Sequence, residues 1–149
     1  MKDIFSSIYE TWFGLYEQNY DLLFTTLYND GGYIKFGLTF ILIPLICWAL
    51  FYFVWRYPYG KIWHWLVWLV FIIVIVCGTT WGLVNAEIFS SVDPGLMEAL
   101  ADPASGYETY ALSLPMKYAI FNGILTIAIS ILFSLIMKQF SKIQTHLPI

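Results

Sequence analysis

The chain has 149 residues, of which 60% are hydrophobic and 20% aromatic, while only 11% are charged. Soluble globular proteins carry roughly 25% charged residues, so the composition excludes an ordinary soluble protein. Its aromatic content excludes a disordered chain. Seven basic residues against ten acidic ones give a net charge of −3 and no basic face, which argues against a nucleic-acid partner. The composition therefore indicates a membrane protein whose partner is the lipid bilayer.

The first segment, residues 1–32, precedes the long apolar runs. Apolar residues recur at helical spacing between residues 3 and 28, with acidic and polar residues mostly between them, so we predict one amphipathic helix that ends at Gly31 and Gly32. Interfacial helices that bind anionic lipid carry lysine or arginine on their polar face, whereas this one carries carboxylates. Packing against protein is therefore the favoured interpretation, and simple contact with lipid is the alternative.

Three long runs predict membrane-spanning helices at residues 36–55, 62–84 and 118–138. At 1.5 Å per residue, a helix of about 20 residues covers the roughly 30 Å hydrocarbon thickness of a bilayer. The short link between the first two runs contains Pro58 and Gly60 and can join only antiparallel neighbours, so residues 33–84 form a transmembrane hairpin. The predicted fold class is an all-α integral membrane protein with three transmembrane helices.

The link between the second and third runs, residues 85–117, is acidic. Asp93 followed by Pro94 predicts the N-cap and first turn of a short helix, which Asp102 and Pro103 end. The stretch that follows, residues 104–110, shows no periodicity and predicts a loop.

Basic residues are unevenly distributed along the chain. The hairpin link, the end of the third span and the tail at 139–149 hold Arg56, Lys61, Lys138 and Lys142 and no acid, whereas all ten acids lie on the other side of the predicted spans. Because lysine and arginine near span ends mark the cytoplasmic side, we predict an external N-terminus and a cytoplasmic C-terminus. The expected location is a bacterial inner membrane, crossed several times.

Four tryptophans crowd the predicted cytoplasmic end of the hairpin: Trp55, Trp63, Trp65 and Trp68. Tryptophan is enriched at the level of the lipid headgroups, so we interpret them as interface anchors. A cage for a ligand cation is the less favoured alternative.

Catalytic and metal-binding patterns are weak. His64 lies at the edge of the second span and His146 in the tail, which suits neither a haem held by two histidines in the membrane nor a metal site with the distant acids. We interpret Cys47 and Cys77 as small buried hydrophobic residues, and the sequence leaves open whether they approach each other. We therefore expect no enzyme activity, no cofactor and no metal.

Two patterns within the predicted spans place particular residues on one face of a helix. Gly78 and Gly82 form a G-x-x-x-G pair, which lets helix backbones approach closely in lipid, so that face of the second span is expected to pack. In the third span, polar side chains recur every four residues; we call this set the polar row, and it consists of Asn122, Thr126, Ser130 and Ser134, with Lys138 one step beyond.

The polar row has two interpretations. The favoured one is that its hydroxyls and amide bond to their own helix or to a neighbouring helix, as modest interhelical contacts. The alternative is that the row lines the pore of an oligomer, in which case Asn85 and Glu87 at the outer end of the second span are candidates for a polar ring at its mouth.

The size of the chain and the absence of a catalytic set favour a repeated subunit. The leading hypothesis is a homo-oligomeric inner-membrane protein that acts as an ion channel or as a membrane platform of an envelope assembly. The alternative is an accessory subunit of a secretion or respiratory complex that docks another envelope protein through its acidic outer face. A holin-like permeabiliser is a third possibility, and a membrane enzyme ranks last.

The predicted orientation is directly testable. A reporter fused after Ile149 is expected to report a cytoplasmic location, because the basic residues near the ends of the spans lie on that side. Alkaline phosphatase and green fluorescent protein fusions at the same position give opposite readouts. Active phosphatase with dark fluorescent protein would overturn the orientation.

Overall fold

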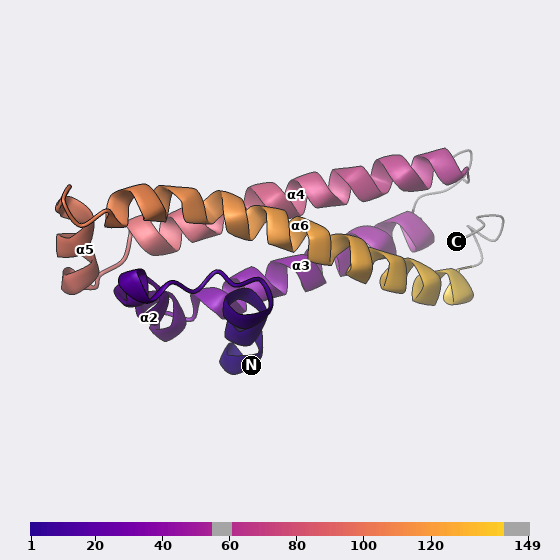
Figure 1. Ribbon diagram of the computed structural model, residues 1–149. Helices are drawn as coiled ribbons and strands as arrows, with labels where there is room; N and C mark the ends of the chain where they lie inside the picture. The colour runs from indigo at the N-terminus through magenta and orange to yellow at the C-terminus, as the bar shows by residue number, and fades with distance from the viewer. Residues whose placement is uncertain (55–60, 142–149) are drawn as a thin grey trace.

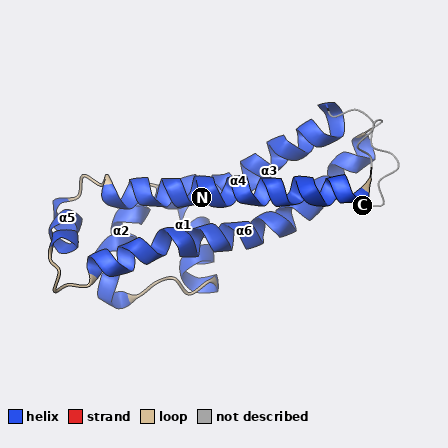
Figure 2. Cartoon of the chain, turned by 90° about the horizontal axis from the view of Figure 1, so that it is seen from above, coloured by secondary structure: helices blue, strands red, loops and turns tan. Residues whose placement is uncertain are grey.

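The computed structural model describes residues 1–54 and 61–141, and every regular element in those two ranges is helical. Trp55, the rest of the hairpin link up to Gly60, and the tail beyond residue 141 lie outside the described residues. The chain forms an elongated bundle of three long helices, with shorter helices at one end and along one side (Figures 1 and 2).

The three long helices are α3 (Gly32–Ala49), α4 (Ile62–Phe89) and α6 (Tyr107–Phe140). A π-helical turn, η3 (Leu50–Val54), extends α3 to a continuous apolar helix over Gly32–Val54. Each of the three is long and apolar enough to cross a membrane, which confirms the prediction of three candidate spans. All three pairs of long helices are in contact, so together they enclose one core.

The long helices extend beyond the predicted spans at the end of the bundle that carries the acidic residues. There α4 and α6 continue past the start of α3, and α5 (Pro94–Ala101) joins them (Figure 1). This end, formed by α2 (Asp21–Asn29), α5, the last turns of α4 and the first turns of α6, is called the acidic end below. Asp93 accepts hydrogen bonds from the backbone N–H groups of Gly95 and Leu96, which confirms the predicted cap of α5.

The predicted loop after Pro103 is wrong in part, because α6 begins at Tyr107. Gly106, at φ +74°, turns the chain into the helix. Tyr110, Ala111 and Leu114 are then buried at helical spacing, and Tyr110 stacks on Tyr20 with ring centroids 4.1 Å apart. The apolar face of this part of α6 is short, and its partner lies far away in the sequence, so periodicity alone did not reveal it.

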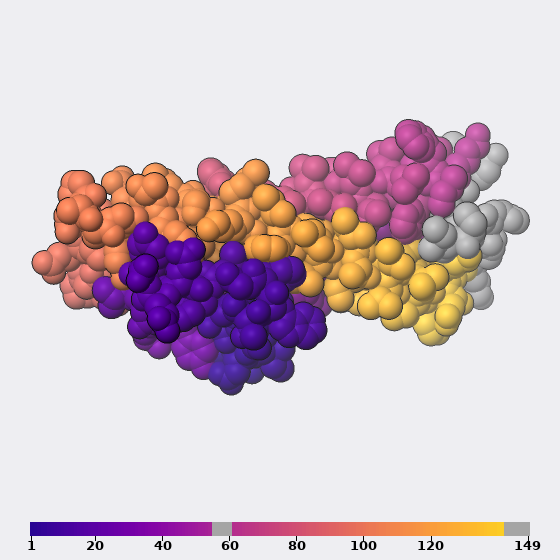
Figure 3. Space-filling view, viewed as in Figure 1, coloured from indigo at the N-terminus to yellow at the C-terminus, as the bar shows by residue number. Residues whose placement is uncertain are grey.

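The N-terminal region is not the single helix predicted for residues 3–28. It begins with α1 (Lys2–Ser6) and a π-helix η1 (Ser7–Trp12), together called the first helix below. A short 3-10 turn η2 (Gln18–Tyr20) and α2 (Asp21–Asn29) follow. At Gly14 the backbone leaves the right-handed helical conformation, with φ at +62°. Residues with a side chain rarely adopt this conformation, whereas glycine does so readily. The region therefore folds back on itself, and Figure 3 shows it covering one side of the bundle. The predicted stop is confirmed at Gly31, at φ +73°.

Two glycines let elements approach more closely than other residues allow. A Cβ atom on Gly37 would lie 2.3 Å from the ring of Phe5, so the first helix rests in a notch on α3. A Cβ atom on Gly123 would lie 2.9 Å from Cys77 Sγ, where α4 and α6 meet. These contacts fix the N-terminal region and α4 against the other spans.

Gly37→Ala is expected to destabilise the protein by about 1–3 kcal/mol, because the added methyl overpacks the notch that holds Phe5. The matched control is Gly95→Ala in α5, where a Cβ meets only Asp93 Oδ1 at 3.4 Å and the higher helix propensity of alanine is slightly stabilising. The unfolding free energy in mixed micelles measures both variants. Equal effects of the two substitutions would contradict the close packing at Gly37.

Candidate functional site

The polar row lies inside the bundle. Asn122, Thr126, Ser130 and Ser134 are all 0% exposed and lie along the line on α6 that faces α3 and α4. Steps of four residues keep their side chains on one slowly winding line of the helix. Thr39 of α3 and Thr80 of α4, both buried, complete a polar interior at the level of Asn122.

Asn122 is the centre of this network. Its Oδ1 atom accepts a hydrogen bond from the Tyr9 hydroxyl at 2.6 Å, which connects the N-terminal region to α6. Its Nδ2 atom lies 3.0 Å from the carbonyl oxygen of Phe36, 3.1 Å from Thr39 Oγ1 and 2.9 Å from Thr80 Oγ1. One amide thus connects all three long helices and the N-terminal segment.

The rest of the row forms two kinds of contact. Thr126 donates to the carbonyl oxygen of Asn122 on its own helix, at 2.6 Å. Ser134 lies 2.7 Å from the Tyr52 hydroxyl of η3 and accepts from Trp65 Nε1 of α4 at 2.8 Å. Within the described part of the chain, Ser130 Oγ is buried without a hydrogen-bond partner. The row therefore joins helices near both of its ends.

This placement bears on the pore-lining interpretation of the row. The four side chains point into the core of one chain and reach no surface that a second copy would share. Water on the axis of an oligomer would not contact them in this arrangement. Asn122 and Ser134 instead form hydrogen bonds to neighbouring helices, as expected if the row holds the helices together.

The two candidate mouth residues also have partners within the chain. Glu87 of α4 pairs with Lys35 of α3, with Lys35 Nζ 2.5 Å from Glu87 Oε1. Asn85 donates to the carbonyl oxygen of Trp81 one turn earlier, at 3.2 Å. Glu87 thus joins α4 to α3, and Asn85 bonds within its own helix. Within one chain the two residues form no ring.

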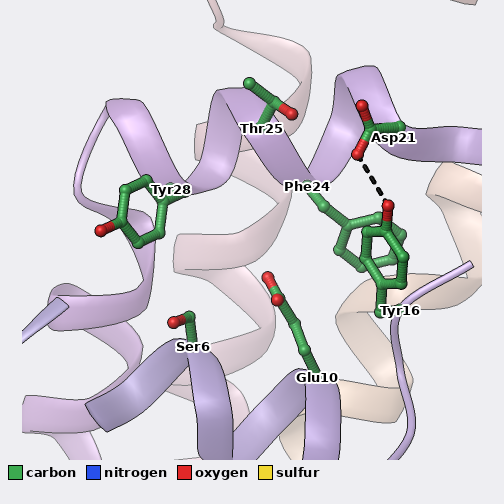
Figure 4. A pocket seen from close by; sticks show the side chains of 7 residues that line it. All are labelled: Ser6, Glu10, Tyr16, Asp21, Phe24, Thr25 and Tyr28. Atoms are coloured by element: carbon green, nitrogen blue, oxygen red, sulfur yellow. Dashed lines mark hydrogen bonds between the residues drawn. The ribbon is translucent and has the colours of Figure 1, made fainter. Parts of the chain in front are cut away.

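A pocket of about 220 Å³ lies at the acidic end, between the first helix and α2 (Figure 4). The Glu10 carboxylate points into it, and Asp21 lies across from it, where it accepts a hydrogen bond from the Tyr16 hydroxyl at 2.9 Å. Behind the pocket, the Tyr33 hydroxyl donates to Glu10. The complete lining consists of Ser6, Glu10, Tyr16, Asp21, Phe24, Thr25 and Tyr28.

Carboxylate–tyrosine pairs recur through the N-terminal region. Tyr28 donates to Asp3 at 2.5 Å, and this hydrogen bond lowers the pKa of Asp3. The same bond raises the pKa of Tyr28, and the bond to Asp21 raises the pKa of Tyr16. The carboxylates of this region are thus held by phenol hydroxyls, and Lys35–Glu87 is the one ion pair among the described residues.

The tryptophans near the hairpin link differ in their surroundings. Trp63 is 68% exposed, as an interface anchor requires, whereas Trp65 is 4% exposed and stacks on Trp48. Trp68 donates its Nε1 proton to the carbonyl oxygen of Cys47 at 3.1 Å. Trp65 and Trp68 therefore hold α4 against α3 and α6 with N–H groups that face protein.

The G-x-x-x-G pair faces away from the core of its own chain. Gly78 and Gly82 lie on the exposed side of α4, and a Cβ on either meets nothing within 4 Å. Ala86, one step further, is exposed as well. The close contacts inside the chain are made by Gly37 and Gly123, which sequence reasoning did not select. Gly37 has no small residue four positions away, whereas Gly123 follows Ala119 by four, which was an available signal.

No catalytic or metal-ligating constellation appears in the described residues. No group of three histidine, cysteine or acidic side chains is placed to hold a metal ion within residues 1–54 and 61–141. Cys47 and Cys77 are free thiols, and Cys77 donates to the carbonyl oxygen of Ala119 at 3.3 Å. Sequence reasoning missed Tyr9, Thr39 and Thr80, although the two threonines are polar residues within the spans, which was an available signal.

Asn122→Leu is expected to lower the unfolding free energy by about 2 kcal/mol, because it removes the interhelical bonds and leaves the buried Tyr9 hydroxyl without its acceptor. The control is Thr79→Val on the exposed face of α4, where the hydroxyl bonds only to the carbonyl oxygen of Ile75. Its effect is expected to stay within about 0.5 kcal/mol. Indistinguishable stabilities of the two variants would contradict the central role of Asn122.

In comparisons with protein-family models, with curated proteins and with solved structures, nothing matches this chain. What the protein does is therefore inferred from its own residues and geometry.

Proposed function

We propose that the protein is a homo-oligomeric membrane subunit that serves as a platform for a larger envelope assembly. The observation that carries the proposal is the outward position of Gly78 and Gly82 on α4. A face of small residues in a membrane-spanning helix has its main use in close helix packing, and among the described residues nothing lies within 4 Å of a Cβ at either glycine.

The physical basis lies in the properties of lipid as a solvent. Lipid chains are as apolar as leucine, so the hydrophobic effect drives little association between spans, and close van der Waals contact between small residues becomes important. Gly78, Gly82 and Ala86 recur every four residues and form a continuous shallow strip on α4. The α4 helix of a second copy presents the same strip, so two copies are able to pack backbone to backbone.

The platform version is preferred to the channel version because of the polar row. Asn122, Thr126 and Ser134 already hold hydrogen bonds within one chain, and the row reaches no shared surface. A conducting path lined by the row requires water inside a single bundle, where these side chains are fully buried. The bonds support a structural use of the row.

The alternative, an accessory subunit that docks another protein through its acidic face, has its own support. All ten acidic residues precede the last membrane-spanning part of α6, and the three basic residues among them have internal contacts. Lys2 donates to the carbonyl oxygen of Asn29, Lys35 pairs with Glu87, and Lys117 lies 4.8 Å from the centre of the Tyr110 ring. The net negative charge left at this end suits a basic partner domain.

The test is to replace Gly78 and Gly82 together by leucine and to measure the mass of the protein particle in mild detergent by light scattering. The wild-type protein is expected to be an oligomer and the double variant a monomer, because leucine keeps the α4 backbones apart. Ala128→Leu is the control, since it adds apolar bulk on the exposed face of α6 instead of α4.

Three results are informative. An oligomer that survives the double substitution would contradict the α4 contact, and a monomeric wild-type protein in lipid nanodiscs would contradict self-association altogether. A complex that purifies from its native membrane only together with a second protein would favour the accessory-subunit alternative.

A further inference from the structure

The first helix, formed by α1 and η1 (Lys2–Trp12), is apolar on two sides. Phe5 and Tyr9 face the bundle and are buried, while Ile4 and Trp12 are 62% and 79% exposed. Ile4, Ile8 and Trp12 lie four residues apart, and together with Asp3 and Ser7 they line a shallow hollow on the outside of the helix. Side chains four residues apart lie on the same face of a helix. We call these three residues the outer apolar edge.

The docking contacts fix the depth of this helix along the bundle. Phe5 packs on Gly37 and meets the Phe40 ring at a centroid distance of 6.1 Å, and Tyr9 bonds to Asn122. These partners lie within about one turn of where the charge-free runs of α3 and α6 begin, at residues 36 and 118. One helical turn is roughly 5 Å, so the first helix lies just inside the apolar part of the bundle.

The two edges of the first helix point in different directions. Ser6 and Glu10 face the pocket shared with α2, which lies nearer the acidic end (Figures 1 and 4). The outer apolar edge lines a separate hollow away from that pocket. The polar edge is thus directed toward the acidic end, and the apolar edge is directed away from it.

Both carboxylates of the helix accept hydrogen bonds from tyrosines, and Asp3 also borders the outer hollow. Asp3 accepts from Tyr28 of α2, and Glu10 accepts from Tyr33 of α3. Lys2, at the start of the helix, donates to the carbonyl oxygen of Asn29. The three residues of the outer apolar edge are uncharged, and the carboxylate beside them, Asp3, is already hydrogen-bonded to Tyr28.

We propose that the first helix lies in the plane of the membrane, in the leaflet at the acidic end, with its outer apolar edge against the acyl chains. Helices of this kind bury their apolar face about 5–10 Å below the headgroups, which is the depth that the docking contacts give. A soluble partner does not reach this level beside the spans. The helix is held in the leaflet by apolar contact with lipid, by the hydrogen bond from Tyr9 to Asn122 and by the packing of Phe5 on Gly37. Its position is therefore independent of anionic lipid.

The test is collision accessibility of nitroxide labels on the full chain. Cys47 and Cys77 are replaced by alanine, and a single cysteine is placed at Ile4 or at Trp12. The protein is reconstituted in phosphatidylcholine vesicles, with or without phosphatidylglycerol. Both labels are expected to collide readily with oxygen and poorly with a nickel chelate, to the same degree in both kinds of vesicle.

Two control labels calibrate the measurement. Leu132, exposed on α6 within the apolar run, gives the value for lipid, and Val92, 94% exposed between α4 and α5, gives the value for water. Nickel accessibility at Ile4 and Trp12 equal to that at Val92 would overturn the proposal. Low accessibility to both reagents would also overturn it, because it would place protein against this edge. Since neither label lies on α4, these outcomes are separate from those of the glycine test.

A second measurement avoids the cysteine substitutions. In vesicles of brominated phosphatidylcholine, tryptophans that touch acyl chains lose fluorescence. Trp12→Phe is expected to lower the quenched fraction of the total emission, because it removes a tryptophan in contact with lipid. A rise in that fraction would mean that Trp12 had been shielded from lipid and would overturn the proposal.

Discussion

The structure depends on the need to satisfy one buried amide. Asn122 is 0% exposed within an apolar run, and an amide without partners costs free energy in such surroundings. Its hydrogen bonds reach Tyr9, the carbonyl oxygen of Phe36, and Thr80, which belong to three different parts of the chain. Apolar contact in lipid is non-specific, so this requirement fixes which faces of the helices meet.

Asn122 also explains why the N-terminal region is part of the fold. Without the Tyr9 hydroxyl, the Oδ1 atom would face apolar surroundings, and the first helix supplies that hydroxyl while Phe5 fills the notch at Gly37. A polar contact and a close apolar contact four residues apart thus hold the helix in one register. The result is a compact unit in which every described segment before the hairpin link contacts a span or the segment next to it.

Much of the fold was predictable from the sequence, because its strongest signals are local. The three charge-free runs and the Asp93–Pro94 cap each depend on neighbouring residues, and the structure confirms them. The start of α6 at Tyr107 depends on a partner distant in sequence, Tyr20, and prediction failed there. Prediction also failed at Gly14, where a local signal, the glycine itself, was outweighed by the helical spacing of the apolar residues around it. The polar row was found by its spacing, but its direction required knowledge of Thr39 and Thr80 on the other helices.

The two proposed surfaces lie on different sides of the bundle, and this separation has a physical cause. The first helix contacts α3 and meets α6 through Asn122 and through the stack of Phe13 on Phe121, whose centroids are 4.1 Å apart. The strip of Gly78, Gly82 and Ala86 lies on the exposed face of α4. Since α4 turns its buried face to the polar row, its small residues are left for a neighbour. Copies that pack through α4 would therefore leave the first helix at the rim of the oligomer, in contact with the surrounding lipid.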